Sequence, residues 1–131
     1  YVEARAPDGG LVGGEVVFDK VSVGATENIL MAATLASGTS VIRGAACEPE
    51  VTDLAEMLVS MGADIAGIGT STLTVRGVAA LSGTDYRVIS DRIETGTYLC
   101  AAAMTGGELE LIDARRDTLE SVIAALEVIG V

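Results

Sequence analysis

Lys20 is the only lysine in the 131-residue chain, and it precedes a segment suited to open a helix, Val21-Ser22-Val23-Gly24-Ala25-Thr26. The first N–H groups of a helix have no intrahelical acceptor, and the helix dipole concentrates positive charge there, so that this end binds anions. Ser22 is suited to cap the helix, Gly24 lets a ligand approach the backbone, and Lys20 adds a positive charge. These residues predict a diphosphate site, with a capped helix beside a solvated lysine as the alternative.

Acidic and basic residues at two later helix starts are further candidates for a cleft. Glu48 and Glu50 flank a proline where a second helix is predicted to begin. They either face a cleft or simply complement the helix dipole, which favours acidic residues in the first turn. Asp91 and Glu94 form a capping pair before an alanine-rich helix, and Arg92 follows Asp91 directly. The residues alone leave open whether Asp91 serves a cleft or only caps its helix.

Composition excludes several other kinds of site. The chain has 19 acidic and 8 basic residues, a formal charge of −11, 3% aromatic residues and no tryptophan. Such a chain does not attract nucleic acids or anionic membranes. Histidine is absent from the sequence, and Cys47 and Cys100 lack CxxC spacing, so neither a metal site nor histidine-based acid/base catalysis is predicted. We expect both cysteines to be buried and reduced.

Length and hydropathy indicate a globular protein with a real core. Half of the residues are hydrophobic, yet no stretch has the length of a membrane span or the pattern of a secretory leader. A cytoplasmic protein is therefore the expectation. The chain begins at Tyr1 in mid-pattern and stops just past a predicted helix, so we expect it to be an internal part of a longer protein.

The elements that must position the candidate residues form a repeat with a period of about seventy residues. Residues 31–38 (MAATLASG) resemble residues 100–107 (CAAAMTGG), and a β-prone stretch and an amphipathic helix follow each of them. Both of these helices end at a glycine, Gly62 or Gly130, which suits the left-handed position that closes a helix. The period is too long for a helical solenoid and fits a supersecondary module.

The first copy predicts a βαβαββ module over about residues 13–78. Its expected elements are a strand at 15–18, a helix at 23–36, a strand at 40–42, a helix at 50–61, and a hairpin of strands 64–68 and 72–76. The first helix is apolar nearly all round, so we expect it to be buried. The second helix carries one apolar stripe, and we expect it at the surface.

The second copy is predicted to be a partial module. It comprises an opening strand at 86–89, the alanine-rich helix after Asp91, a β-prone stretch at 109–112 and a helix at 118–129. The hairpin that would close it has no counterpart in the sequence. The predicted fold class is therefore α+β (α/β), with one complete and one partial βαβαββ module.

Three sequence blocks lie within this repeat, DKVSVGATEN at 19–28, EPEVTDL at 48–54 and SDRIETGT at 90–97. Together they resemble the enolpyruvyl transferase family, in particular its members that act on UDP-N-acetylglucosamine. The resemblance covers nearly the whole chain from Gly10 onward. It implies an inside-out α/β barrel of two lobes, in which residues 1–89 end the nucleotide-sugar-binding lobe and residues 90–131 begin the second lobe.

The same resemblance implies an activity for the parent protein. The enolpyruvyl group of phosphoenolpyruvate would be transferred to the 3′-hydroxyl of UDP-N-acetylglucosamine, with release of phosphate, at the committed step of peptidoglycan synthesis. It implies no metal and no organic cofactor. The residues that match the family's nucleotide-sugar contacts are Lys20, Val21, Ser22 and Val23, and we add Gly24 because the N–H groups after Ser22 are open donors.

The family resemblance also bears on the weaker candidates. Glu48 keeps its two readings, a residue that faces the cleft or one that only complements the helix dipole. In the family, the chain crosses between the lobes close to Asp91 and Arg92, so that either these residues link the lobes on closure or Asp91 only caps its helix. Cys47 stands where the family commonly has arginine, which removes a basic group from this turn. Nothing in the chain matches the family's catalytic cysteine loop, its lysine–asparagine pair or its proposed general base. We therefore predict no catalytic residue in this chain.

Three functional readings follow. The first is the UDP-N-acetylglucosamine enolpyruvyl transferase, with this chain inactive on its own. The second is the related transferase that acts on shikimate 3-phosphate, against which the block around Lys20 argues. The third is a non-catalytic folding or interaction module, which would self-associate through exposed apolar surface.

Overall fold

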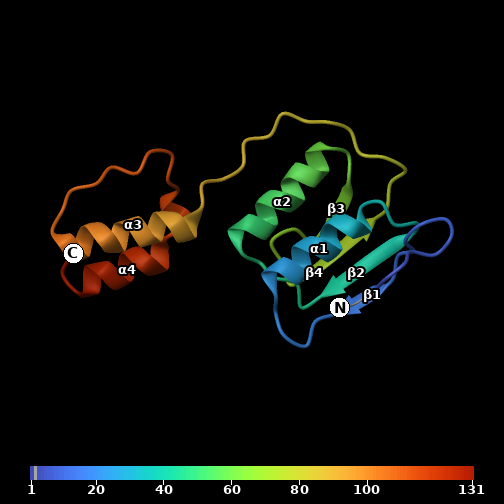
Figure 1. Ribbon diagram of the computed structural model, residues 1–131, viewed down its shortest axis with the longest axis horizontal. Coiled ribbons are helices and arrows are strands. Elements are labelled where there is room, and N and C mark those ends of the chain that lie inside the picture. Colours follow the sequence, from blue (N-terminus) through green and yellow to red (C-terminus); the bar gives the residue numbers. More distant parts are fainter. Residues whose placement is uncertain (2) are drawn as a thin grey trace. The chain divides into compact units, whose positions relative to one another are not determined.

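The computed structural model describes residue 1 and residues 3–131, and these form two compact units, Tyr1–Arg87 and Val88–Val131 (Figure 1). The first unit contains a four-stranded sheet and two helices, and the second contains helices joined by a long loop. No helix within the described part of the chain is long and apolar enough to cross a membrane.

The sheet of the first unit has the order β1-β2-β4-β3. Strand β1 (Glu15–Val17) runs parallel to β2 (Thr39–Arg43), and β4 (Thr72–Arg76) runs antiparallel to both β2 and β3 (Asp64–Ala66). Between the strands come the helices α1 (Val23–Ala33) and α2 (Pro49–Ser60). This element order confirms the predicted βαβαββ module.

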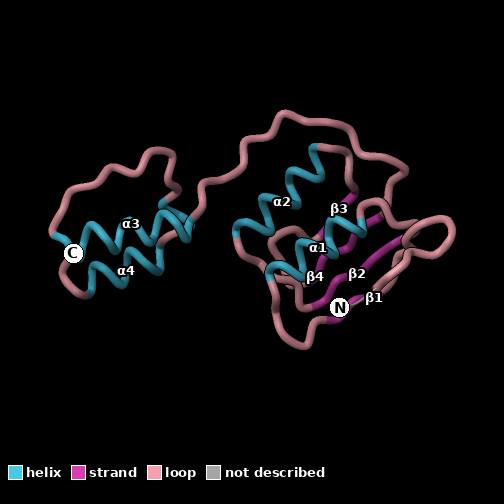
Figure 2. The backbone as a smooth tube through the Cα atoms, viewed as in Figure 1, coloured by secondary structure: helices cyan, strands magenta, loops and turns pink. Residues whose placement is uncertain are grey.

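Both helices of the first unit pack on the sheet and against each other (Figure 2). Strands β2 and β4 alternate buried and less buried residues, which turns Ile42, Leu73 and Val75 toward the core, where Leu30 of α1 meets them. The predicted apolar stripe of α2 is confirmed, since Val51, Ala55 and Leu58 are buried. These contacts attach both helices to one face of the sheet.

One glycine permits a very close approach in this unit. A Cβ atom added at Gly77 would lie 1.5 Å from the carbonyl oxygen of Ala36, just beyond the end of α1. The Gly77 N–H donates to Gly38 O, and the next N–H, of Val78, donates to Thr34 O at 2.8 Å. The chain that leaves β4 is thereby fastened to the turn that follows α1.

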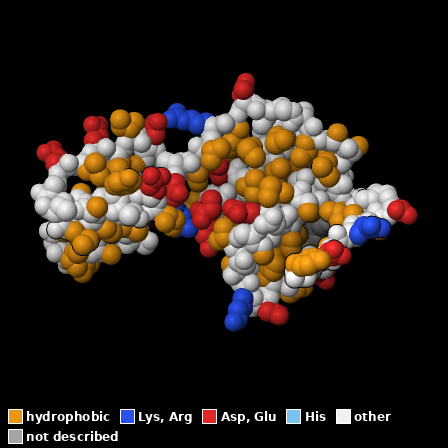
Figure 3. Space-filling model, in the orientation of Figure 1, with side chains coloured by type: hydrophobic (Ala, Val, Ile, Leu, Met, Phe, Trp, Pro, Cys, Tyr) orange, Lys and Arg blue, Asp and Glu red, His pale blue; other side chains and the backbone are white. Residues whose placement is uncertain are grey.

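The prediction that the first helix is buried was wrong. Only Thr26, Leu30 and Ala33 of α1 are buried, whereas Met31 is 44% exposed and Leu35, just beyond its end, is 55% exposed. The physical reason is that the sheet covers one face of α1 and α2 contacts only part of the rest. Figure 3 shows hydrophobic side chains gathered on the face of this unit that α1 and α2 cover.

The second unit consists of α3 (Arg92–Thr105), a short 3₁₀ helix η1 (Arg116–Thr118) and α4 (Glu120–Val128). Asp91 caps α3, as predicted, and accepts hydrogen bonds from Ile93 N at 2.8 Å and Glu94 N at 3.1 Å. Gly106 closes α3 in a left-handed conformation. The helices α3 and α4 contact each other.

Two predicted strands do not form. Residues 86–89 and 109–112 belong to no strand, although both were expected to begin or continue the second module. A strand needs neighbours for its backbone hydrogen bonds, and the two stretches do not pair with each other or with the four-stranded sheet.

The prediction of buried cysteines was also wrong. Cys47 and Cys100 are both free and exposed. Cys47 lies in the loop before α2, and Cys100 lies on a turn of α3 that lines an open pocket. Apolar neighbours in the sequence therefore did not imply burial.

Candidate functional site

The segment around Lys20 connects the end of β1 to the start of α1. Ser22 caps the helix from an extended conformation, with φ −143° and ψ 118°, and its hydroxyl accepts a hydrogen bond from Ala25 N at 3.3 Å. The N–H of Thr26 donates to Ser22 O, which begins the helical hydrogen bonding. The N–H groups of Val23 and Gly24 come before that point and are oriented along the helix axis, where they can bind an anion.

This segment is open to solvent. Lys20, Val21, Ser22 and Gly24 are exposed, and Val23 is half-buried. A Cβ atom added at Gly24 would have no neighbour within 4 Å, so a ligand can reach the backbone there. Among the ion pairs found in the described residues, none involves Lys20. The ammonium group is thus free to bind an external anion.

The start of α2 lies at the same edge of the sheet. Strands β1 and β2 are parallel, so the helices that follow them begin on the same side, as Figure 2 shows. Inside this edge, the Oγ1 atom of Thr26 accepts a hydrogen bond from Ala46 N at 3.0 Å. Ligands of open α/β sheets commonly bind at the carboxyl ends of parallel strands.

Glu48 is the N-cap residue of α2 but makes no side-chain capping bond. It is half-buried, and Pro49 occupies the first helical position. The carbonyl of Glu48 accepts hydrogen bonds from Val51 N and Thr52 N, so its backbone starts the helix while its carboxylate does not. A place for Glu48 in a cleft stays a prediction. The same holds for any effect of Cys47, its exposed neighbour.

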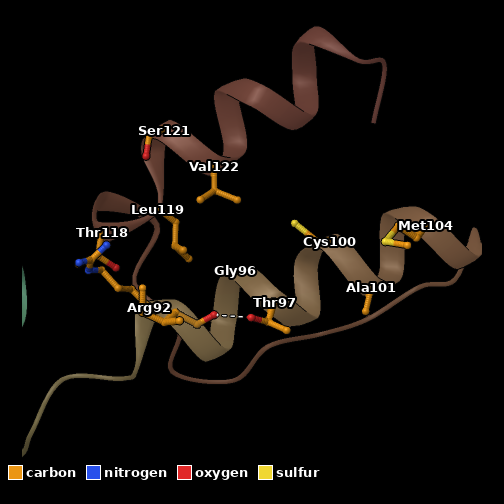
Figure 4. A pocket seen from close by; sticks show the side chains of 11 residues that line it. Arg92, Gly96, Thr97, Cys100, Ala101, Met104, Thr118, Leu119, Ser121 and Val122 are labelled. Carbon is orange, nitrogen blue, oxygen red and sulfur yellow. Dashed lines mark hydrogen bonds between the residues drawn. The ribbon is translucent and has the colours of Figure 1, made fainter.

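Asp91 and Arg92 belong to the second unit, so they are described apart from the segment 20–24. One carboxylate oxygen of Asp91, Oδ1, accepts both hydrogen bonds of the α3 cap. Arg92 lines a pocket of about 510 Å³ between α3 and the start of α4, together with apolar residues such as Leu119 and Val122 (Figure 4). The capping role of Asp91 is confirmed, and a role of either residue in linking two lobes stays a prediction.

No group of three or more histidine, cysteine, aspartate or glutamate side chains in the described residues is placed to hold a metal ion. The segment 20–24 itself offers backbone N–H groups and one ammonium group, which can bind an anion.

Comparison with known proteins decides the family. The family model described as EPSP synthase (3-phosphoshikimate 1-carboxyvinyltransferase) matches residues 2–131. The chain belongs to this carboxyvinyltransferase family. Within it, the chain is 58% identical over 131 residues to the UDP-N-acetylglucosamine 1-carboxyvinyltransferase of Novosphingobium aromaticivorans, covering all of this chain and 31% of that protein.

Further carboxyvinyltransferases agree with this relative. The protein of the same name from Sinorhizobium fredii is 57% identical over 130 residues, which are 99% of this chain and 30% of that protein. The one from Paramagnetospirillum magneticum is 60% identical over 123 residues, which are 94% of this chain and 28% of that protein. The chain thus spans less than a third of the length of these curated relatives.

A solved structure supports the fold of the chain. The crystal structure of the enolpyruvyl transferase NikO from Streptomyces tendae matches it with a TM-score of 0.62 at 24% identity, over 75% of this chain and 28% of that one. At this identity the likeness concerns the fold alone. The predicted enolpyruvyl transferase fold is confirmed.

One contact of this chain was missed by reasoning from the sequence. The hydroxyl of Tyr86 donates to Asp53, with distances of 3.0 Å to Oδ1 and 3.1 Å to the backbone oxygen. Desolvation and the hydrogen bond to Asp53 raise the pKa of Tyr86 to about 12. The two residues are 33 positions apart, and no local pattern signals such a pair.

Proposed function

We propose that this chain is part of an enzyme that transfers the enolpyruvyl group of phosphoenolpyruvate to the 3′-hydroxyl of UDP-N-acetylglucosamine. In this reaction the 3′-hydroxyl oxygen forms a bond to the enolpyruvyl carbon and gives up its proton, the bond from that carbon to the phosphate oxygen breaks, and the phosphate leaves with the proton. The observation that carries the proposal is the 55–60% identity to enzymes named for this reaction. The chain's share of the reaction is to hold the UDP-sugar.

Lys20, Val21, Ser22, Val23 and Gly24 are the proposed contacts to the UDP-sugar. Two phosphate groups carry the charge that a helix start and an ammonium group attract. The support is the open N–H groups at the start of α1, the exposed Lys20 and the unobstructed backbone at Gly24. In a chain of formal charge −11, an anionic ligand needs such a local site, because the overall field repels it.

The cellular role proposed with this activity is the committed step of peptidoglycan synthesis in the cytoplasm. Phosphoenolpyruvate and UDP-N-acetylglucosamine are the proposed substrates, and no cofactor is proposed. We assign the catalytic groups, which would help to make and break the bonds of the substrates, to residues outside these 131.

The second candidate is transfer to shikimate 3-phosphate, which the description of the matching family model favours. The deciding experiment gives the full-length protein phosphoenolpyruvate with each acceptor in turn and measures phosphate release. We expect turnover with UDP-N-acetylglucosamine only. Turnover with shikimate 3-phosphate alone would overturn the proposal, and no turnover with either would favour the non-catalytic module.

A further inference from the structure

We propose that Thr26 is a positioning residue for the UDP-sugar, an inference that rests on the proposed function. Thr26 does not touch the ligand in this proposal. It sets the orientation of the N–H groups at the start of α1 by joining the first turn of that helix to the loop that leads into α2.

The hydroxyl of Thr26 donates one hydrogen bond and accepts another. Its Oγ1 atom donates to Ser22 O at 2.7 Å and accepts from Ala46 N at 3.0 Å, and the residue is fully buried. Ala46 is only 2% exposed. Loss of the hydroxyl would leave a buried backbone N–H without an acceptor, which is costly in a protein interior.

The loop on the other side of this contact is itself fixed to the sheet. The N–H of Ala45 donates to Ser71 O at 3.0 Å, and the carbonyl of Arg43 accepts from Phe18 N at 2.9 Å. The loop after β2 is therefore a firm support. Thr26 transmits that support to Ser22, whose backbone directs the N–H groups of Val23 and Gly24.

Orientation matters at this point because hydrogen bonds to a phosphate weaken quickly when donors turn away from the acceptor. Phosphoenolpyruvate is not proposed to bind these N–H groups. A loosened first turn of α1 should thus weaken the binding of the UDP-sugar far more than the binding of phosphoenolpyruvate. A residue that served only the stability of the fold would not discriminate between the two substrates.

The chain offers a matched control at the opposite end of the same helix. Thr34 is 1% exposed, and its Oγ1 atom donates to Met31 O at 2.7 Å. It resembles Thr26 in burial and in its bond to a helix carbonyl. It lies three turns away from Ser22, at the C-cap of α1.

The experiment compares Thr26→Val, Thr26→Ser and Thr34→Val in the full-length protein. We expect Thr26→Val to raise the KM for UDP-N-acetylglucosamine by about tenfold, as the loss of one buried hydrogen bond would. The KM for phosphoenolpyruvate should change by less than about twofold, and Thr26→Ser should restore most of the affinity because it keeps the hydroxyl. Thr34→Val should leave both KM values unchanged. Thermal unfolding shows whether each variant is folded, and Thr26→Ala replaces Thr26→Val if the latter is not.

Three outcomes would overturn the inference alone. In the first, the wild-type protein binds the UDP-sugar and the Thr26 variants without a hydroxyl bind it equally well. In the second, these variants bind both substrates more weakly to the same extent, and in the third, Thr26→Ser is as impaired as they are; either result assigns Thr26 to general stability. A wild-type protein that does not bind UDP-N-acetylglucosamine would overturn the proposed function, and this inference with it.

Discussion

At the scale of single residues, Lys20 and Tyr86 differ in exposure and in the partners of their polar groups. Lys20 is exposed and makes none of the ion pairs found among the described residues, so its charge is available to a ligand. Tyr86 is half-buried, and its hydroxyl is committed to Asp53. The first is expected to affect substrate binding, and the second is expected to affect stability.

Replacing Lys20 with alanine in the full-length protein should raise the KM for UDP-N-acetylglucosamine about tenfold or more, because a charge-assisted hydrogen bond to phosphate is lost. The KM for phosphoenolpyruvate should change much less. Steady-state kinetics with each substrate varied in turn measures both constants, and Lys20→Arg serves as the charge-preserving control. A larger effect on phosphoenolpyruvate would contradict the assignment.

Tyr86 should make stability depend on pH in the alkaline range. Its pKa is about 12 in the folded chain and 10.0 as the ordinary value, so the folded state keeps a proton that the unfolded state loses first. The stabilisation is full below pH 10 and disappears as the pH rises toward 12.

Denaturant unfolding of the wild type and Tyr86→Phe at a series of pH values tests this dependence. The variant should be less stable by about 1 kcal/mol at neutral pH, the usual worth of a hydrogen bond. The difference in unfolding free energy between the variant and the wild type should become smaller above pH 10. A difference that stays constant across that range would show that the Tyr86 hydroxyl does not titrate as described.

At the scale of elements, the first module was predictable throughout, whereas in the second module the two helices were predictable and the two strands were not. Local signals such as Ser22, Pro49 and Gly62 mark helix ends, and alternation marks the strands, so the βαβαββ order followed from the sequence. The stretches 86–89 and 109–112 have the same strand-like composition but lack a sheet to join. Strand formation depends on partners far along the chain, which local patterns do not report.

The candidate site shows the same division. The cap at Ser22 and the cap at Asp91 follow from residue types at a fixed spacing, and both are present. The contact of Thr26 with Ala46 spans 20 residues and required the structure. Exposure of Met31 and Leu35 also escaped prediction, because hydrophobic periodicity says which face could be covered and not what covers it.

Gly77 gives the prediction that belongs to this scale. Gly77→Ala would place a Cβ atom 1.5 Å from the Ala36 carbonyl oxygen, so that the backbone must move. We expect a loss of about 2 kcal/mol or more of folding free energy, the usual cost of overpacking. Gly83→Ala is the control, because its Cβ would meet nothing within 4 Å and should leave stability nearly unchanged. Denaturant unfolding measures the unfolding free energy of both variants. Equal values for Gly77→Ala and Gly83→Ala would contradict the close approach of Gly77 to Ala36.

At the scale of the whole molecule, the two units carry different parts of the proposed enzyme. The segment 20–24 lies in Tyr1–Arg87, and the Asp91 cap lies in Val88–Val131. The assignment of these units to the ends of two lobes stays a prediction. Catalysis by such enzymes requires groups to converge on both substrates.

The purified 131-residue chain should therefore show no enolpyruvyl transfer. Incubation with phosphoenolpyruvate and UDP-N-acetylglucosamine, followed by a phosphate assay, should give no release above the rate without enzyme. The full-length protein under the same conditions is the positive control. Measurable transfer by the short chain would mean that catalytic groups lie within it, and the proposed division of labour would fall.

The exposure of both cysteines provides each unit with its own attachment point for a dye. Cys47 lies in the first unit and Cys100 in the second, and the chain contains no other thiol. A donor and an acceptor fluorophore attached to these two sulfurs would report the separation of the units in solution by energy transfer, without engineered labelling sites. Adding UDP-N-acetylglucosamine to the labelled chain would then show directly whether that separation responds to the nucleotide sugar.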